Sequence, residues 1–186
     1  MHPPSIVALA TAFLGGGLAL AQAARPPPSP IPSPGVVLGE LHAVNTLEVE
    51  LGNQAQSRAS QLEVKQFGQH MVKAHTRMDA HVSEYAKKHH LTVTPPPEDP
   101  QHQVAEEADA TLKRRLESLQ GPAFDRAYAQ AMLEGHGKVL TQLIAWQSAA
   151  RDPDLKDFID SASKEVAQHK QEAADLVALL DKRASR

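Results

Sequence analysis

Residues 62–85 read LEVKQFGQHMVKAHTRMDAHVSEY, and this stretch decides the fold class. Its apolar and aromatic residues, together with one histidine, recur at spacings of three and four, the period of one face of an α-helix. The face consists of Val64, Phe67, Met71, Ala74, Met78, His81 and Tyr85. We therefore predict a long amphipathic helix over residues 61–89, which ends before the prolines at 95–97.

A second helical pattern lies directly before this one, over residues 37–58. Its inward face consists of Val37, Leu41, Val44, Leu51 and Ala55, with Glu48 at the position that completes the spacing. Between the two helices, Ser60 and Glu63 have the spacing of a capping box, in which the serine hydroxyl accepts from the Glu63 amide. So short a connection predicts an antiparallel helix hairpin.

The C-terminal half repeats this organisation. Gly121 and Pro122 mark the start of a helix over 122–149, and Asp152 and Pro153 predict the cap and first residue of another over 153–182. The inward faces are Phe124, Tyr128, Met132, Val139, Leu143 and Trp146 in the first, and Leu155, Ile159, Ala162, Val166, His169, Ala173, Leu176 and Leu180 in the second. A shorter helix over 101–119 connects the two halves, with Val104, Ala108, Leu112 and Leu116 on its apolar face.

These patterns predict an all-α fold. The two antiparallel hairpins would form a ferritin-like four-helix bundle over residues 37–183, and the short helix would be a crossover that travels the length of the bundle. Such a crossover favours up-down-down-up topology. The low aromatic content of 4% and the scarcity of β-branched runs agree with this class.

The first 36 residues have a different character. Ile6 to Ala21 is an uncharged apolar stretch, and Ala21-Gln22-Ala23 is a small-x-small cleavage pattern, so residues 1–23 are predicted to be a secretory signal peptide. An uncleaved N-terminal anchor is the alternative interpretation. Residues 24–36 are proline-rich and predict an extended linker. We expect an exported protein, periplasmic or associated with the cell envelope, with no transmembrane span in the mature chain.

Composition excludes several classes of function. The chain has no cysteine, which rules out disulfides, cysteine-based metal sites and thiol catalysis. A formal charge of −3 gives no indication of nucleic-acid binding. No P-loop, nucleophile elbow or dinucleotide-binding fingerprint is present, so the sequence favours a protein without catalytic activity.

Four segments together resemble a known family. They are LEVELGNQAQSRAS (47–60), EVKQFGQHMVKAHT (63–76), GPAFDRAYAQAMLEGHGKVL (121–140) and DPDLKDFIDSASKEVAQHK (152–170). In this order they resemble the bacterial exported domain-of-unknown-function family 4142, over roughly residues 37–182. The resemblance implies a ferritin-like helical bundle behind a signal peptide and no assigned activity. The positions that match the family's recurring polar residues are Glu48, Glu50, His75, His136 and His169.

Some of these polar residues also fall at or beside inward-facing positions of the predicted helices, where apolar residues are expected. Glu48 and His169 occupy inward positions by spacing, His136 does so by interpolation, and His75 lies beside the inward face. All four are expected at mid-bundle height, where buried charge needs a partner. Mutual pairing of these side chains is one explanation. A divalent metal such as zinc or iron, bound by this cluster with Glu50 and Glu165 as further candidates, is the other.

Three functions remain open at this stage. The favoured one is an exported, non-catalytic bundle that acts in the cell envelope or in stress tolerance, with an envelope partner or a second copy of itself. The second is a metal-binding bundle that uses the mid-bundle Glu/His cluster. The third is a metal-dependent oxidase. The Glu-x-x-His motif of ferritin-like di-iron centres is missing from the sequence, which argues against a di-iron site.

Overall fold

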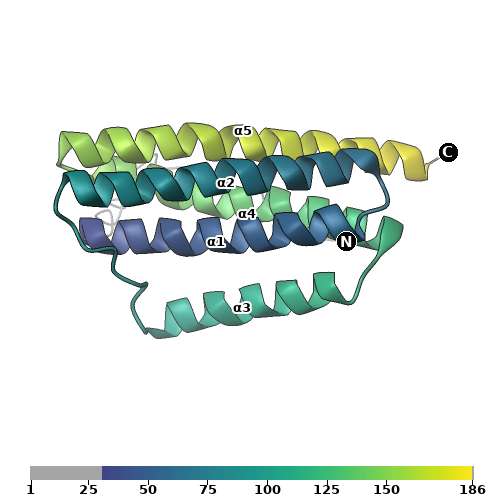
Figure 1. Ribbon diagram of the computed structural model, residues 1–186, viewed down its shortest axis with the longest axis horizontal. Helices are drawn as coiled ribbons and strands as arrows, with labels where there is room; N and C mark the ends of the chain where they lie inside the picture. The colour runs from purple at the N-terminus through teal and green to yellow at the C-terminus, as the bar shows by residue number, and fades with distance from the viewer. Residues whose placement is uncertain (1–30, 186) are drawn as a thin grey trace, which may run out of the picture.

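The computed structural model describes residues 31–185, and this part of the chain contains α-helices and no strand. The helices are α1 (Pro34–Arg58), α2 (Leu62–Lys88), α3 (Pro100–Glu117), α4 (Gly121–Ala149) and α5 (Pro153–Ala184) (Figure 1). The all-α prediction is thus confirmed. The predicted signal peptide at 1–23 and most of the predicted linker at 24–36 lie outside the described residues, and α1 begins at Pro34 rather than at residue 37.

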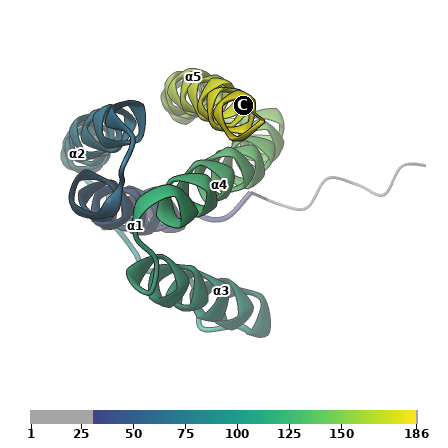
Figure 2. The ribbon, with the colours of Figure 1, turned by 90° about the vertical axis from the view of Figure 1, so that its right-hand side faces the viewer.

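The helices form two antiparallel hairpins, α1 with α2 and α4 with α5 (Figure 1). Between them, α3 runs back along the length of the bundle, so that α2 and α4 point in the same direction. This is the up-down-down-up order that the crossover predicted. Seen end-on, α3 lies outside the four-helix arrangement, beside α1 and α4 (Figure 2).

Two separate apolar clusters fill the bundle. One, towards the α1–α2 turn, includes Leu51, Met71, Phe124, Tyr128 and Met132. The other, at the opposite end, includes Val37, Leu38, Met78, Leu143 and Ile159. Along α2, α4 and α5, a buried histidine lies between the residues of one cluster and those of the other. The middle of the bundle is therefore a polar layer between two apolar cores.

The α1–α2 hairpin is held unusually close by two glycines. A Cβ atom on Gly68 would lie 2.6 Å from the Cβ of Ala55 and 2.8 Å from the carbonyl oxygen of Gly52. A Cβ on Gly52 would lie 2.7 Å from the carbonyl oxygen of Gly68. The two backbones pack directly against each other here, and no other residue type fits without a shift.

The predicted capping box at the start of α2 is wrong. Gln61 is the N-cap residue and has no side-chain cap, and the Ser60 hydroxyl donates to Asp125 instead. Asp125 on α4 also accepts from the backbone amides of Ser60 (2.9 Å) and Gln61 (3.1 Å). Since Asp125 is only 1% exposed, this helix start is capped by a buried carboxylate from the other hairpin.

The inward face of α2 also differs from the prediction in its second half. His81 is exposed, and Val82 and Ala86 are buried in its place. From Met78 onwards the buried positions repeat every four residues, because a straight helix has 3.6 residues per turn and drifts away from a strict alternation of three and four.

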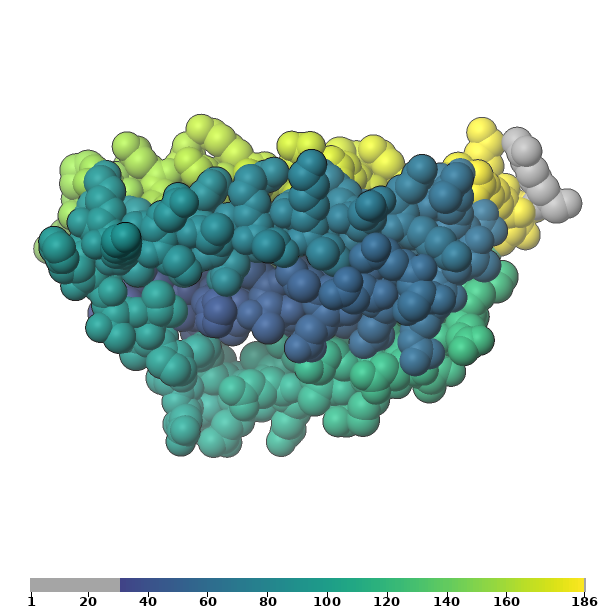
Figure 3. Space-filling view, in the orientation of Figure 1, coloured from purple at the N-terminus to yellow at the C-terminus, as the bar shows by residue number. Residues whose placement is uncertain are grey.

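The crossover helix α3 buries few of its side chains and also makes polar contacts with α1. Of its residues, all of them described, Leu116 is the one that is buried, and Val104, predicted on its apolar face, is 66% exposed. His102 Nε2 lies 2.6 Å from Glu40 Oε1 on α1, and Lys113 Nζ donates to Glu50 Oε2 over 2.9 Å. In Figure 3 the helix forms a separate ridge along the lower edge, below α1.

Within residues 31–185, no helix combines the length and the apolar character that a membrane crossing requires.

Candidate metal centre

Three histidines from three different helices meet in the polar layer. His75 lies on α2, His136 on α4 and His169 on α5, and none of them is more than 3% exposed. Each histidine offers one ring nitrogen, and these three nitrogens lie within 4.8 Å of one another. The ring centres are 5.7 Å apart for His75 and His136, 5.2 Å for His75 and His169, and 5.4 Å for His136 and His169. The structure thus brings together His75, His136 and His169, three of the residues that the sequence predicted for this cluster.

Hydrogen bonds determine which nitrogen of two rings carries the proton. His75 Nδ1 lies 2.9 Å from the side-chain oxygen of Asn45, and His136 Nδ1 lies 2.8 Å from the carbonyl oxygen of Met132. Both oxygens can only accept, so each Nδ1 must donate. The Nε2 atom of each ring therefore keeps a free lone pair.

These lone pairs have no partner among the described residues. His75 Nε2, His136 Nε2 and His169 Nδ1 are all buried without a hydrogen bond. Buried polar atoms in folded proteins are normally paired, so three unpaired atoms at one place need an explanation. An imidazole that donates through one nitrogen and presents the other to a shared centre is the usual arrangement of a metal-ligating histidine.

Burial keeps His75 and His169 neutral. Burial, followed by the neighbouring histidines, lowers the pKa of His75 from 6.5 to about 3. The pKa of His169 also falls to about 3, mainly through burial and then through His136 and His70. Both rings are therefore uncharged at neutral pH, and the uncharged imidazole is the form that binds a metal ion.

Glu48 is buried nearby but does not join the three nitrogens. Its Oε1 atom lies 3.9 Å from Nδ1 of His136, the nitrogen that already donates to Met132. Burial raises the pKa of Glu48, and the electrostatic interaction with His136 offsets part of that rise. The hydroxyl of Tyr128, which is buried and unpaired, has a raised pKa through burial and then through Glu48. Glu48 thus lies on the Nδ1 side of His136, whose ring is held by Met132, and Glu48 is not one of the converging ligands.

The two further candidates lie outside the cluster. Glu50 is exposed and pairs with Lys113 on α3. Glu165 pairs with Arg77 over 3.2 Å and contributes none of the converging ligand atoms among the described residues. Of the six residues singled out in the sequence, the structure brings His75, His136 and His169 together.

The family follows from comparison with known proteins. A family model described as a domain of unknown function (DUF4142) matches residues 18–176. The chain belongs to this family. The match confirms the resemblance seen in the four segments, and all three histidines fall inside the matched range. No curated protein and no solved structure matches the chain.

Two residues around the centre of this DUF4142 domain were missed in the sequence. Asn45 is 2% exposed, and its position four residues after Leu41 and three before Glu48 is the spacing that could have identified it as inward-facing. His70 on α2 lies edge-on to His169, with ring centres 5.4 Å apart. Its sequence position could not have identified it, because the side chain of His70 is 44% exposed and lies off the inward face of α2.

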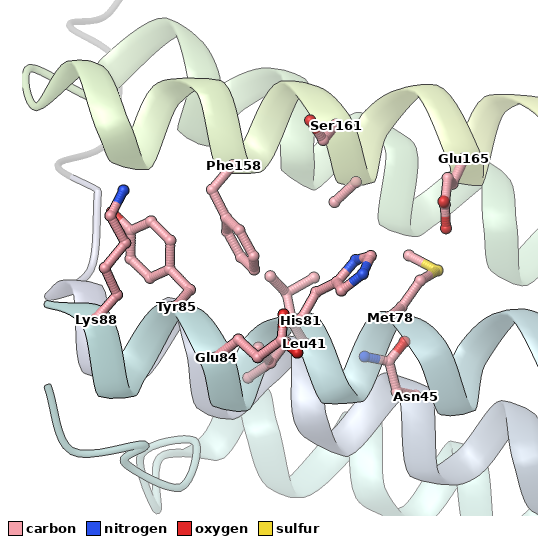
Figure 4. Close-up of a pocket in the computed structure, with 12 residues that line it drawn as sticks. Leu41, Asn45, Met78, His81, Glu84, Tyr85, Lys88, Phe158, Ser161 and Glu165 are labelled. Atoms are coloured by element: carbon pink, nitrogen blue, oxygen red, sulfur yellow. The ribbon is translucent and has the colours of Figure 1, made fainter.

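A groove between α2 and α5 reaches Asn45, the residue that contacts His75. It encloses about 370 Å³ and is lined by apolar residues such as Met78 and Phe158. Figure 4 shows Asn45, Met78 and Glu165 near one end of this groove and Tyr85 and Lys88 near the other. Asn45, which holds His75, therefore forms part of the groove wall.

Proposed function

We propose that this DUF4142 protein binds one divalent transition-metal ion through His75 Nε2, His136 Nε2 and His169 Nδ1. The observation that carries the proposal has two parts: these three nitrogens are buried without a hydrogen-bond partner, and the three rings each offer a ring nitrogen within 4.8 Å of the other two. A bound ion would satisfy all three at once. Export to the periplasm or cell envelope is part of the proposal and rests on the apolar stretch at residues 6–21 and the cleavage pattern after it.

The donor set favours particular ions. Imidazole nitrogens suit zinc, copper, nickel and iron, and three of them leave a coordination position for water or another small ligand. Carboxylate-rich di-iron centres use glutamates as the main ligands, and the converging atoms here are all imidazole nitrogens. This supports a mononuclear site that holds or buffers an ion, and it gives less support to a ferritin-like oxidase.

Metal binding is tested directly with protein purified without a histidine tag. Elemental analysis after exposure to zinc should give one equivalent per chain. At a hundredfold excess of free metal over the dissociation constant, the free energy of unfolding should rise by about 2.7 kcal/mol. Failure of zinc, manganese, copper, nickel and anaerobic Fe(II) all to stabilise the protein would reject the proposal.

His169→Leu separates a metal site from a purely structural cluster. A leucine suits this inward position, so the metal-free variant should be as stable as the parent or more so. In a metal-binding protein the same change should remove the stabilisation by metal. His42→Leu is the matched control, because His42 is exposed, pairs with Asp79 and offers no atom to the group of three converging histidines. If His169→Leu stabilises the protein and no metal effect exists in the parent, the non-catalytic envelope interpretation without metal is favoured.

A further inference from the structure

We propose that His70 and Glu172 form an outer capture site through which the metal ion reaches the three-histidine centre. This inference rests on the proposed metal-binding function and adds a route to it. It assigns a binding role to two surface residues that take no part in holding the ion at its final position.

The centre needs such a route because it is closed to solvent. His75, His136 and His169 are 1%, 2% and 3% exposed, so a hydrated ion in solution cannot contact their nitrogens directly. A hydrated divalent ion must also lose most of its water before it can occupy a site of this kind. A ligand at the surface that replaces the first water molecules would ease both steps.

His70 and Glu172 have the position and chemistry for that task. Their side chains are 44% and 35% exposed, and His70 Nε2 lies 3.5 Å from Glu172 Oε2. An imidazole next to a carboxylate is a common ligand pair for divalent transition metals. The pair thus offers two ligand atoms to an ion that arrives from solvent.

The outer pair leads directly to the buried centre. The ring of His70 meets His169 edge-on with centres 5.4 Å apart, and His169 lies 5.2 Å from His75 and 5.4 Å from His136 by the same measure. The four imidazoles therefore form a continuous series from the surface to the centre.

Charge favours this side of His169 over the other. Along α5, Glu165, His169 and Glu172 lie four and three residues apart and share one helix face. On the Glu165 side, Arg77 places a guanidinium 3.2 Å from the carboxylate, next to the end of the groove between α2 and α5. The Glu165 carboxylate is thus already paired with a cation, whereas Glu172 pairs with His70 and with no lysine or arginine among the described residues.

The experiment measures the rates of metal binding and release. Stopped-flow absorbance with Co(II) follows binding to the metal-free chain, and excess chelator follows release. His70→Ala and Glu172→Gln should each lower the association rate constant by about tenfold, because they remove a cation-attracting ligand at the surface. The dissociation rate constant should fall by the same factor and leave the Kd unchanged, since neither residue binds the ion in its final position.

His42→Ala is the matched control. His42 and Asp79 form another surface imidazole–carboxylate pair, at 2.7 Å, and neither residue belongs to the group of three converging histidines. This variant should leave both rate constants unchanged.

The results distinguish this inference from the function on which it rests. If Co(II) binds and His70→Ala changes neither rate constant, the capture site is wrong and the metal centre stands. If His70→Ala raises the Kd through faster release alone, His70 is a ligand of the bound ion, which also overturns the capture role. If the parent chain binds no Co(II), zinc or other divalent ion, both proposals fall together.

Discussion

The side-chain oxygen of Asn45 lies 2.9 Å from Nδ1 of His75, and this contact connects α1 to a cluster to which α1 contributes no histidine. By accepting a hydrogen bond from the Nδ1–H group, Asn45 leaves the lone pair of His75 on Nε2, the buried atom that has no hydrogen-bond partner. This one hydrogen bond fixes both the tautomer of His75 and the orientation of its ring. Asn45 is therefore expected to act on metal affinity without touching the ion.

Replacement of Asn45 tests this positioning role. Asn45→Leu keeps a similar volume but removes the acceptor, and metal affinity should fall by about 10- to 100-fold. Asn45→Asp restores an acceptor and should recover most of the affinity. Competition titration with a chromophoric chelator measures both. Equal affinities for Asn45→Leu and the parent would contradict the role.

Stability of the metal-free protein should fall with acidification. The pKa values of His75 and His169 are lowered from 6.5 to about 3 in the folded state, so the unfolded chain takes up protons that the folded chain does not. The stabilising contribution is complete above the unfolded pKa and is lost as the pH falls from 6.5 towards 3. Each histidine should contribute a slope of about 1 kcal/mol per pH unit in the free energy of unfolding.

Urea denaturation between about pH 7 and about pH 5 measures this slope. The difference between the parent and His169→Leu isolates one histidine from all other titrating groups. The slope of the variant should be smaller by the contribution of that one group. Parallel pH profiles for the two proteins would show that His169 is not held neutral by burial.

Two glycine substitutions should change stability in opposite directions. Gly68→Ala would place a Cβ 2.6 Å from that of Ala55, and the helices of the first hairpin would have to separate, at a cost of about 1–3 kcal/mol. A Cβ on Gly135 in α4 would meet nothing within 4 Å. Gly135→Ala should therefore stabilise the protein by about 0.5–1 kcal/mol, because alanine favours helix. Thermal unfolding of the two variants provides the comparison, and a stabilised Gly68→Ala would refute the close packing.

Loss of the buried carboxylate at Asp125 should weaken the start of α2. Asp125→Ala leaves the amides of Ser60 and Gln61 without their acceptor, and a loss of about 2 kcal/mol or more is expected. Asp125→Asn keeps one oxygen acceptor and should lose less. Hydrogen exchange should show faster exchange at residues 60–63 in the alanine variant. If exchange there is unchanged, the cap across the two hairpins has no role in stability.

The sequence pattern was sufficient for the helices and for much of the centre, because both depend on local periodicity. The spacing of α4 and α5 places His136 and His169 inward, and both are buried. The spacing of α1 likewise placed Glu48 at the level of the histidines along the bundle axis. That level alone does not tell on which side of His136 the Glu48 side chain lies. That side depends on how α1 packs against α4, which is a property of the assembled bundle.

The roles of Asp125 and His70 were not predicted, because they depend on contacts between residues that are far apart in the sequence. Asp125 caps a helix that begins more than sixty residues earlier, as the separations of 65 and 64 from Ser60 and Gln61 show, and no local motif marks it. The Ser60–Glu63 spacing matched a capping box, but the carboxylate of Asp125 competes successfully for the serine hydroxyl. His70 lies on the exposed side of α2, and its relation to His169 arises only when the two hairpins meet.

The division of the histidines between the hairpins has a consequence for the order of folding. Each hairpin consists of helices adjacent in sequence, so each can form early through short-range contacts. His75 belongs to the first hairpin, and His136 and His169 belong to the second. The three nitrogens meet only in the final docking step, and before that step no half of the molecule offers a complete set of ligands. An ion bound between the hairpins would therefore slow their separation far more than it hastens their assembly, and would lengthen the lifetime of the native state.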